Sequence, residues 1–196
     1  MTTTIRIGGA SGFWGDAAMA TPQLLASGAL DYLVCDYLAE ITMSIMARAR
    51  AADDSKGYAT DFISAVLARN LKEIASSGTK VIANAGGVNA QACAEAARAL
   101  IAEQGLNLKV ATVHGDDLMA QAGVLAASGE REMFTGDEFP ESGKIASINA
   151  YLGAFPIARA LDMGADIVIT GRCVDSAVTL GACIHAFGWH RDDYDK

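Results

Sequence analysis

The chain has 196 residues, of which 52% are apolar and 19% are charged, and its formal net charge at pH 7 is -8. This composition excludes a disordered chain and a coiled coil, and the length suits one substantial core. Acidic and basic residues are interspersed, so no basic stripe can neutralise a nucleic-acid backbone, and we expect no nucleic acid as a partner.

The sequence predicts a cytoplasmic protein without membrane attachment. No apolar run approaches the roughly 18 residues of a membrane span, and the first residues lack a cationic region followed by an apolar one. The four cysteines have no CxxC spacing, and we predict that they are free thiols.

Short runs rich in Ile and Val alternate with helical segments along the chain. The predicted strands lie within residues 4–9, 31–37, 79–87, 108–116, 144–150 and 165–171. Runs without polar alternation are typical of strands buried on both faces, as in parallel sheets. The sequence therefore predicts an α/β fold, with a mainly parallel sheet of about six strands flanked by helices. We favour an open Rossmann-like sheet, and part of a β/α barrel is the alternative.

Signals for helix ends lie between these strands. Thr21 before Pro22 predicts a helix N-cap, Asn89 predicts another, and Gly78 and Gly188 suit the left-handed residue that follows a helix. The polar, turn-rich segment 128–144, with a hairpin around residues 135–138, predicts an excursion from a single α/β domain that spans residues 1–196.

The loops that follow the strands carry most of the polar chemistry. In a parallel α/β sheet these loops meet at one edge, where ligands bind. We predict that a ligand is bound there by Gly9, Ser11, Gly12, Phe13, Trp14, Asn84, Gly86, Gly87, Asn89, Asn149, Arg172, Asp175 and Ser176.

The first of these loops, residues 8–16, reads GGASGFWGD. Its glycine spacing differs from the GxGxxG dinucleotide turn, and Phe13 stands where the GxSxG serine elbow requires a glycine. The remaining interpretation is a glycine-rich turn whose N–H groups hold an anion beside an apolar wall of Phe13 and Trp14. A tight turn with aromatics buried for packing is the alternative.

Two later loops have both a ligand-binding and a structural interpretation. In NAGGVN, residues 84–89, the glycines allow an acyl or phosphate oxygen to approach the main chain, whereas Asn89 can equally cap the next helix. In TGRCVDS, residues 170–176, Arg172 is a predicted clamp for a carboxylate or phosphate, and Asp175 either joins it or stabilises a helix N-terminus. Cys173 is a candidate nucleophile because a helix N-terminus and an arginine lower a thiol pKa.

Acid–base chemistry is predicted for four residues that follow strands on this edge, namely His114, Asp116, Asp117 and Asp36. Carboxylates from several loops would suit a divalent metal, and a metal-dependent hydrolase or aldolase is one alternative function. Because no short ligand spacing requires a metal, we assign no metal ligand and predict no cofactor.

Several stretches together resemble one known family. They are IRIGGASGFWGD, LDYLVCDYLAEITMSI, GYATDF, VIANAGGVN, VHGDDL, NAYLGAFPIARALDMGADIVITGRCVDSAVTLG and FGWHRDDYD. In this order, from residue 5 to the end, they look like the N-terminal domain of the acyclic terpene utilisation protein AtuA family. Members of that family are usually longer, so the chain resembles an N-terminal portion of them.

The resemblance implies a role in the bacterial catabolism of citronellol, geraniol or other branched acids degraded as coenzyme A thioesters. A lyase or hydratase step on a branched acyl-CoA is the activity that it suggests, with coenzyme A as part of the substrate, and it carries over no established catalytic residue. A non-catalytic subunit that binds an acyl-CoA or organic acid is the main alternative. We expect a homo-oligomer or a complex with a partner subunit.

Overall fold

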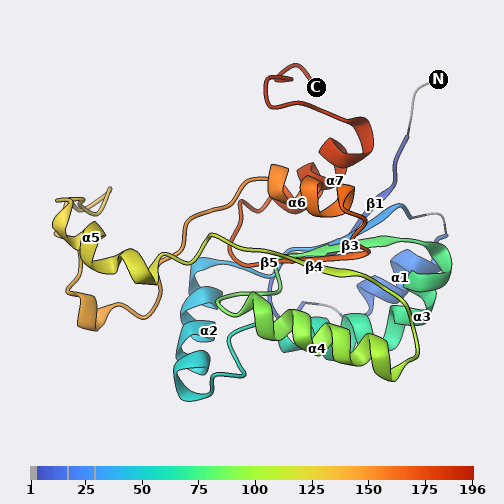
Figure 1. The fold of residues 1–196 in the computed structure, drawn as a ribbon, viewed down its shortest axis with the longest axis horizontal. Helices are drawn as coiled ribbons and strands as arrows, with labels where there is room; N and C mark the ends of the chain where they lie inside the picture. Colours follow the sequence, from blue (N-terminus) through green and yellow to red (C-terminus); the bar gives the residue numbers. More distant parts are fainter. Residues whose placement is uncertain (1–3, 17, 29) are drawn as a thin grey trace.

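A parallel sheet forms the centre of the computed structural model, which describes residues 4–16, 18–28 and 30–196 (Figure 1). In the described residues the sheet has five strands in the order β1-β2-β3-β5-β4, and all four pairings are parallel. The strands are β1 (Ile7–Ser11), β2 (Tyr32–Cys35), β3 (Lys80–Ala83), β4 (Val110–Val113) and β5 (Ile167–Thr170). The predicted open α/β sheet is confirmed, and the sheet does not close into a barrel.

Helices cover both faces of this sheet. They are α1 (Ala20–Ala26), α2 (Glu40–Ala52), α3 (Ala68–Ser77), α4 (Ala90–Glu103), α5 (Ala122–Ala127), α6 (Phe155–Asp162) and α7 (Ala177–Phe187). A π-helical turn, Phe62–Leu67, leads into α3, and short 3₁₀ turns occupy Met119–Gln121 and Ser142–Lys144. Figure 1 shows α1, α3 and α4 on one side of the sheet and α6 and α7 on the other.

Each face of the sheet has its own apolar core. Leu33, Val81 and Ile167 pack with α1, α3 and α4, whereas Ile82 and Val168 pack with α6 and α7. Successive strand residues point to opposite faces, so strands buried on both sides need consecutive apolar residues. This is why β2, β3 and β5 read as continuous apolar runs.

The helix ends follow most of the predicted signals. Asn89 accepts a hydrogen bond from the backbone N–H of Ala92 and caps α4, and Gly78 and Gly188 are left-handed after α3 and α7. The prediction for Thr21 was wrong, because α1 begins at Ala20 and the Thr21 side chain is buried within its first turn.

The predicted strand within residues 144–150 is absent from the sheet. Ile145 and Ile148 stand among small and polar residues in this run, which gives the sheet too little branched apolar surface. The segment instead lies beside the loop after β4, where Leu118 N–H donates to the Ile148 carbonyl at 2.8 Å and Asn149 bridges Asp117.

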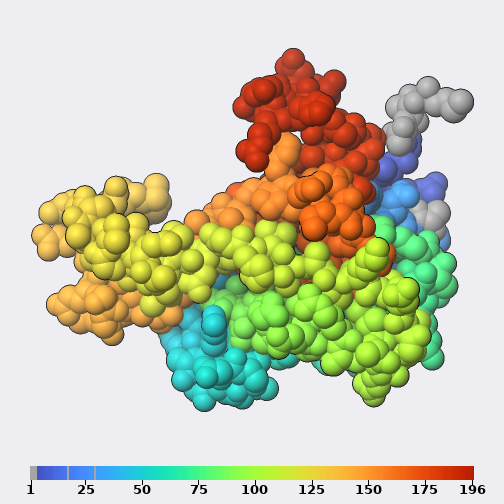
Figure 2. Space-filling view, in the orientation of Figure 1, coloured from blue at the N-terminus to red at the C-terminus, as the bar shows by residue number. Residues whose placement is uncertain are grey.

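Residues 118–148 form a projecting arm. They leave the body after β4, carry α5 outward and return before α6 (Figures 1 and 2). An isolated antiparallel bridge joins Arg131 and Glu138 near the predicted hairpin. The excursion is therefore longer at both ends than the predicted segment 128–144.

Asp166 links the amino ends of three strands at the edge of the sheet remote from the loops described below. Its carboxylate accepts hydrogen bonds from Lys80 Nζ at 2.7 Å and from the Lys109 N–H at 2.8 Å. Burial acts to raise the pKa of the Asp166 carboxyl, but these two donors outweigh it and hold the pKa below its ordinary value.

We expect Asp166→Asn to reduce the free energy of unfolding at neutral pH by about 1 kcal/mol, because the charge-assisted bonds to both lysines weaken. Since the carboxyl pKa is lowered in the folded state, this stability is present at neutral pH and is lost as the pH falls below about 4. Urea unfolding of both proteins at pH 7 and at about pH 3 measures it. A difference that persists at the lower pH would contradict this origin.

Candidate functional site

Two neighbouring strands end in side chains that bond directly to each other. Asp36 follows β2 and Asn84 follows β3, and Asn84 Nδ2 donates to Asp36 Oδ1 at 2.5 Å. The same amide accepts a bond from the Tyr37 N–H at 2.6 Å through its Oδ1. Because Asn84 is fully buried and both ends of its amide are engaged, it holds the half-buried Asp36 carboxyl in one orientation.

The electrostatic surroundings of Asp36 shift its proton affinity. Burial raises the pKa of the Asp36 carboxyl, and the negative charge of Asp175 adds to this effect. The hydrogen bond from Asn84 and the positive charge of Arg172 oppose it without cancelling it. A carboxyl of raised pKa at the end of a central strand is suited to exchange protons with a ligand.

Arg172 is the buried cation of this edge. Its Nη1 donates to the Cys173 carbonyl and to Asp175 Oδ1, both at 2.8 Å, and its Nη2 lies 3.4 Å from Glu40 Oε1. Burial acts to lower the pKa of the Arg172 guanidinium, but Asp175 and Tyr151 outweigh it and raise that pKa. The predicted clamp is thus occupied largely by groups of the chain itself.

Tyr151, just after the returning end of the arm, stacks on this cation. The Arg172 guanidinium lies 4.1 Å from the centre of the Tyr151 ring, and the Tyr151 hydroxyl donates to Glu40. That hydrogen bond, with a smaller effect of Arg172, lowers the pKa of the Glu40 carboxyl. Three segments far apart in the sequence are thereby joined by charge and stacking.

Asp116 connects the loop after β4 to the loop after β5. Its Oδ2 accepts bonds from the Arg172 N–H at 2.8 Å and from Asn149 Nδ2 at 3.0 Å. A Cβ on Gly171 would lie 2.4 Å from the same carboxylate, so this approach requires glycine. Two predicted site residues, Asp116 and Asn149, therefore hold loops together in this structure.

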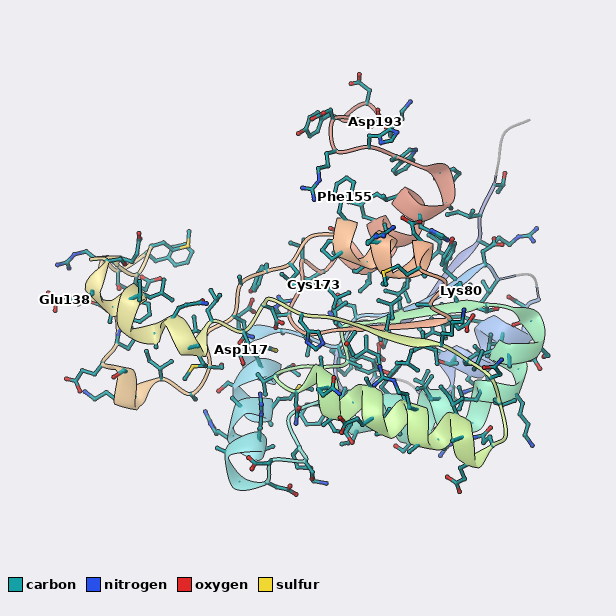
Figure 3. The ribbon with its side chains drawn as sticks, viewed as in Figure 1. Lys80, Asp117, Glu138, Phe155, Cys173 and Asp193 are labelled. Atoms are coloured by element: carbon teal, nitrogen blue, oxygen red, sulfur yellow. The ribbon has the colours of Figure 1, made fainter. Side chains whose placement is uncertain are left out.

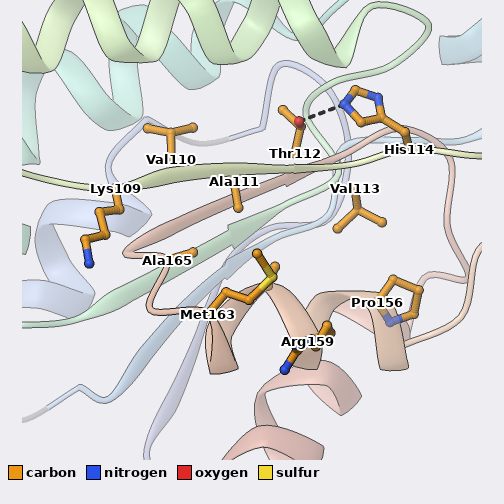
Figure 4. A pocket seen from close by; sticks show the side chains of 11 residues that line it. Lys109, Val110, Ala111, Thr112, Val113, His114, Pro156, Arg159, Met163 and Ala165 are labelled. Carbon is orange, nitrogen blue, oxygen red and sulfur yellow. Dashed lines mark hydrogen bonds between the residues drawn. The ribbon is translucent and has the colours of Figure 1, made fainter.

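His114 and Asp117 lie at the carboxyl end of β4. A cavity of about 200 Å³ between this loop and the start of α4 is lined by Arg50, Asn89, Gln91, His114, Asp116 and Asp117. The His114 ring shares a 2.7 Å hydrogen bond with the Thr112 hydroxyl (Figure 4), and Asp117 accepts one from the Met119 N–H. A second cavity of about 360 Å³ adjoins it and is lined by Arg50, Asp54, Asp117 and Asn149 among others.

Comparison with known proteins identifies the family of this chain. Residues 5–196 match the model of the family described as "Acyclic terpene utilisation family protein AtuA". The chain belongs to this family. Neither the curated proteins nor the solved structures contain a match to it.

The first glycine loop of this AtuA-family chain adjoins Asp36. The Asp36 N–H donates to the Ser11 carbonyl at 3.2 Å, and the Gly12 N–H donates to Asp16 Oδ2 at 2.8 Å. Phe13 is exposed, whereas Trp14 is partly buried against the core on the face of the sheet that α1, α3 and α4 cover, so the two aromatics do not form one wall. A Cβ on Gly9 would meet no atom within 4 Å.

The NAGGVN loop is filled by the protein itself. A Cβ on Gly86 would lie 2.6 Å from the Thr170 carbonyl, and one on Gly87, at φ +53°, would lie 2.3 Å from the Met46 sulfur. Besides capping α4, Asn89 donates to the carbonyls of Asp54 and Lys56. The structural interpretation thus accounts for these positions without a ligand.

The remaining predicted residues have simple environments. Asp175 is exposed and pairs with Arg172, and Ser176 precedes α7 without a side-chain hydrogen bond to it. The candidate nucleophile Cys173 is not activated in this structure, because its thiol is completely buried and burial raises its pKa. All four cysteines are free thiols, as predicted.

Three residues that line or hold this edge were not assigned to ligand binding or catalysis from the sequence. They are Glu40, Arg50 and Tyr151. All three stand in segments without glycine clusters. In the described part of the chain no group of three or more His, Cys, Asp or Glu side chains is placed to hold a metal ion. The same residues contain no helix that is long and apolar enough to cross a membrane.

Proposed function

We propose that this chain acts in the breakdown of acyclic terpenes by proton transfer on a branched acyl-CoA, in a lyase or hydratase type of reaction, with Asp36 as the proton acceptor. The family description supports the metabolic setting. One observation supports the chemistry: a half-buried carboxyl of raised pKa is held in a fixed orientation by the buried amide of Asn84.

In the proposed reaction, the Asp36 carboxylate removes a proton from the carbon next to the thioester, and the electron pair moves toward the thioester oxygen. Two buried donors, the Ser11 hydroxyl and Arg172 Nε, have no hydrogen-bond partner among the described residues. These two donors are enclosed by the protein, so they would reach a developing oxyanion only if the surrounding loops moved when the substrate binds. His114, exposed at the end of the neighbouring strand β4, is the second candidate for proton transfer.

The test is exchange of the substrate proton. Incubation of the protein in D₂O with a citronellyl-derived acyl-CoA, whose carbon next to the thioester is saturated, is expected to introduce deuterium at that carbon, as measured by mass spectrometry. Asp36→Asn keeps the shape of the side chain but removes the base, and should reduce the rate by about 100-fold. Asp192→Asn, at an exposed position of the C-terminal segment, is the matched control and should leave the rate unchanged.

The pH dependence gives a second readout of the same group. Because the pKa of Asp36 is raised, the exchange rate should climb with pH through a value above the ordinary carboxyl range near about 4. A rate that does not depend on Asp36 or on this ionisation would overturn the assignment.

The alternative is a non-catalytic subunit that binds the same ligands. It is favoured by one observation, that most polar groups of this edge, including those of Asn84, Asp116 and Arg172, already bond to the chain itself. Binding of the acyl-CoA without deuterium incorporation, with turnover restored by a partner subunit, would support this alternative.

A further inference from the structure

The arm presents large apolar side chains to solvent. Met133 and Phe134 are 84% and 86% exposed, and Val124 on α5 is 73% exposed. Large apolar side chains exposed next to each other, as those of Met133 and Phe134 are, commonly mark an interaction surface. The arm points away from the body (Figures 1 and 2), so its own chain does not cover these side chains.

The arm is also acidic. Segment 128–144 contains five acidic residues (Glu130, Glu132, Asp137, Glu138, Glu141) and two basic ones (Arg131, Lys144), a net charge of -3. Arg131 pairs with Glu138 and Lys144 pairs with Glu141, whereas Glu130 and Asp137 form no ion pair with a described residue. Figure 3 shows Glu138 on the projecting arm, well away from Asp117 at its base.

A groove of the opposite character runs along the free edge of the sheet. It has a volume of about 440 Å³, lies between β4 and α6, and is lined by Lys109, Val110, Ala111, Thr112, Val113, His114, Pro156, Arg159, Ala160, Met163 and Ala165. Figure 4 shows Lys109 and His114 at the two ends of the strand, with Arg159 of α6 and Met163, which follows α6, across the groove from β4. The groove is open because three of its lining residues are alanines, which have small side chains. Met163 beside it is 70% exposed.

The charge of the groove is opposite to that of the chain. Arg159 is exposed and forms no ion pair with a described residue, and Lys109 adds a second exposed cation, in a chain of net charge -8. The β4 strand pairs only with β5, so its outer edge has no strand partner among the described residues. Free strand edges are normally covered or protected.

We propose that the arm of a second copy of this chain docks into this groove, with Phe134 and Met133 on the apolar floor and the arm carboxylates near Arg159 and Lys109. The two surfaces complement each other in both polarity and charge, and no residue of the arm lines the groove of its own chain. Reciprocal docking covers both surfaces on each copy and gives a closed two-fold dimer. This proposal is independent of the proposed chemistry at Asp36.

Sedimentation velocity and light scattering of the whole chain test this association. The native chain should dimerise, and Phe134→Ser should weaken the dimer by about thirtyfold or more, because a buried aromatic anchor is lost. Arg159→Glu should also weaken it, and more strongly at low salt. Both side chains are exposed, so circular dichroism and thermal unfolding should stay unchanged.

Two controls change similar residues elsewhere. Lys72→Glu at an exposed position of α3 and Tyr194→Ser in the exposed C-terminal segment should leave the association unchanged. A chain that remains monomeric at high concentration, or a dimer insensitive to both Phe134→Ser and Arg159→Glu, would overturn the proposal.

A mixing experiment identifies which surface meets which. Ala111→Phe fills the groove but keeps the arm, whereas Phe134→Ser keeps the groove. Each variant alone should associate weakly, and their mixture should form a heterodimer with one intact contact, measured by fluorescence anisotropy of one labelled variant. Absence of this complementation, with both variants folded, would exclude docking of the arm into the groove.

Discussion

Gly86→Ala should lower the free energy of unfolding by about 3 kcal/mol and the Tm by about 9 °C. The new Cβ would lie 2.6 Å from both the Thr170 carbonyl of β5 and the Ala90 Cβ of α4. The Gly86 N–H also donates to that Thr170 carbonyl at 3.0 Å, which fixes the separation of the two backbones. Because backbone atoms cannot move aside as a flexible side chain can, the loop must shift.

Chemical unfolding of Gly86→Ala and of a matched variant, Gly123→Ala, measures this cost. Gly123 lies in exposed α5, where a Cβ would meet no atom within 4 Å, so alanine there should be neutral or stabilise by up to about 1 kcal/mol. If Gly86→Ala were as stable as the native chain, the close contact between the loop after β3 and strand β5 would be wrong.

The Gly86 contact also shows what a sequence pattern can and cannot determine. Glycine clusters after strands predicted loops that gather at one edge of the sheet, because parallel strands bring their carboxyl ends together. The pattern does not show whether the free space belongs to a ligand or to another segment of the chain. At Gly86 and Gly87 that space belongs to Thr170, Ala90 and Met46.

The five strands were predictable because consecutive apolar residues are required where both faces are buried. Residues 144–150 have fewer consecutive apolar residues than the five strands. Their two isoleucines still resemble a short strand when the tertiary surroundings are unknown. The pairing of Asp36 with Asn84 could be anticipated from adjacent strand ends. The stacking of Tyr151 on Arg172 could not, because the path of the arm decides where Tyr151 returns.

Arg172→Ala should reduce the free energy of unfolding by about 3 kcal/mol, because it removes a buried side chain that stacks on Tyr151 and bonds to the Cys173 carbonyl. The side chain of Arg172 is 4% exposed, whereas those of Glu40 and Asp175 are 78% and 67% exposed. The two carboxylates therefore remain solvated when the cation is lost, and their ion pairs contribute little of this cost. The loss should accordingly depend only weakly on salt concentration.

Arg172→Lys separates charge from shape. A lysine keeps the positive charge but cannot stack as a plane or donate in two directions, so it should recover less than half of the lost stability. Hydrogen exchange should rise at the Leu152 N–H, which donates to the Arg172 carbonyl, and across the returning arm near Tyr151. Arg48→Ala, at an exposed position of α2, is the matched control, with an expected change under about 0.5 kcal/mol. If Arg172→Ala cost no more than this control, the guanidinium would not be the link between the arm, α2 and the loop after β5.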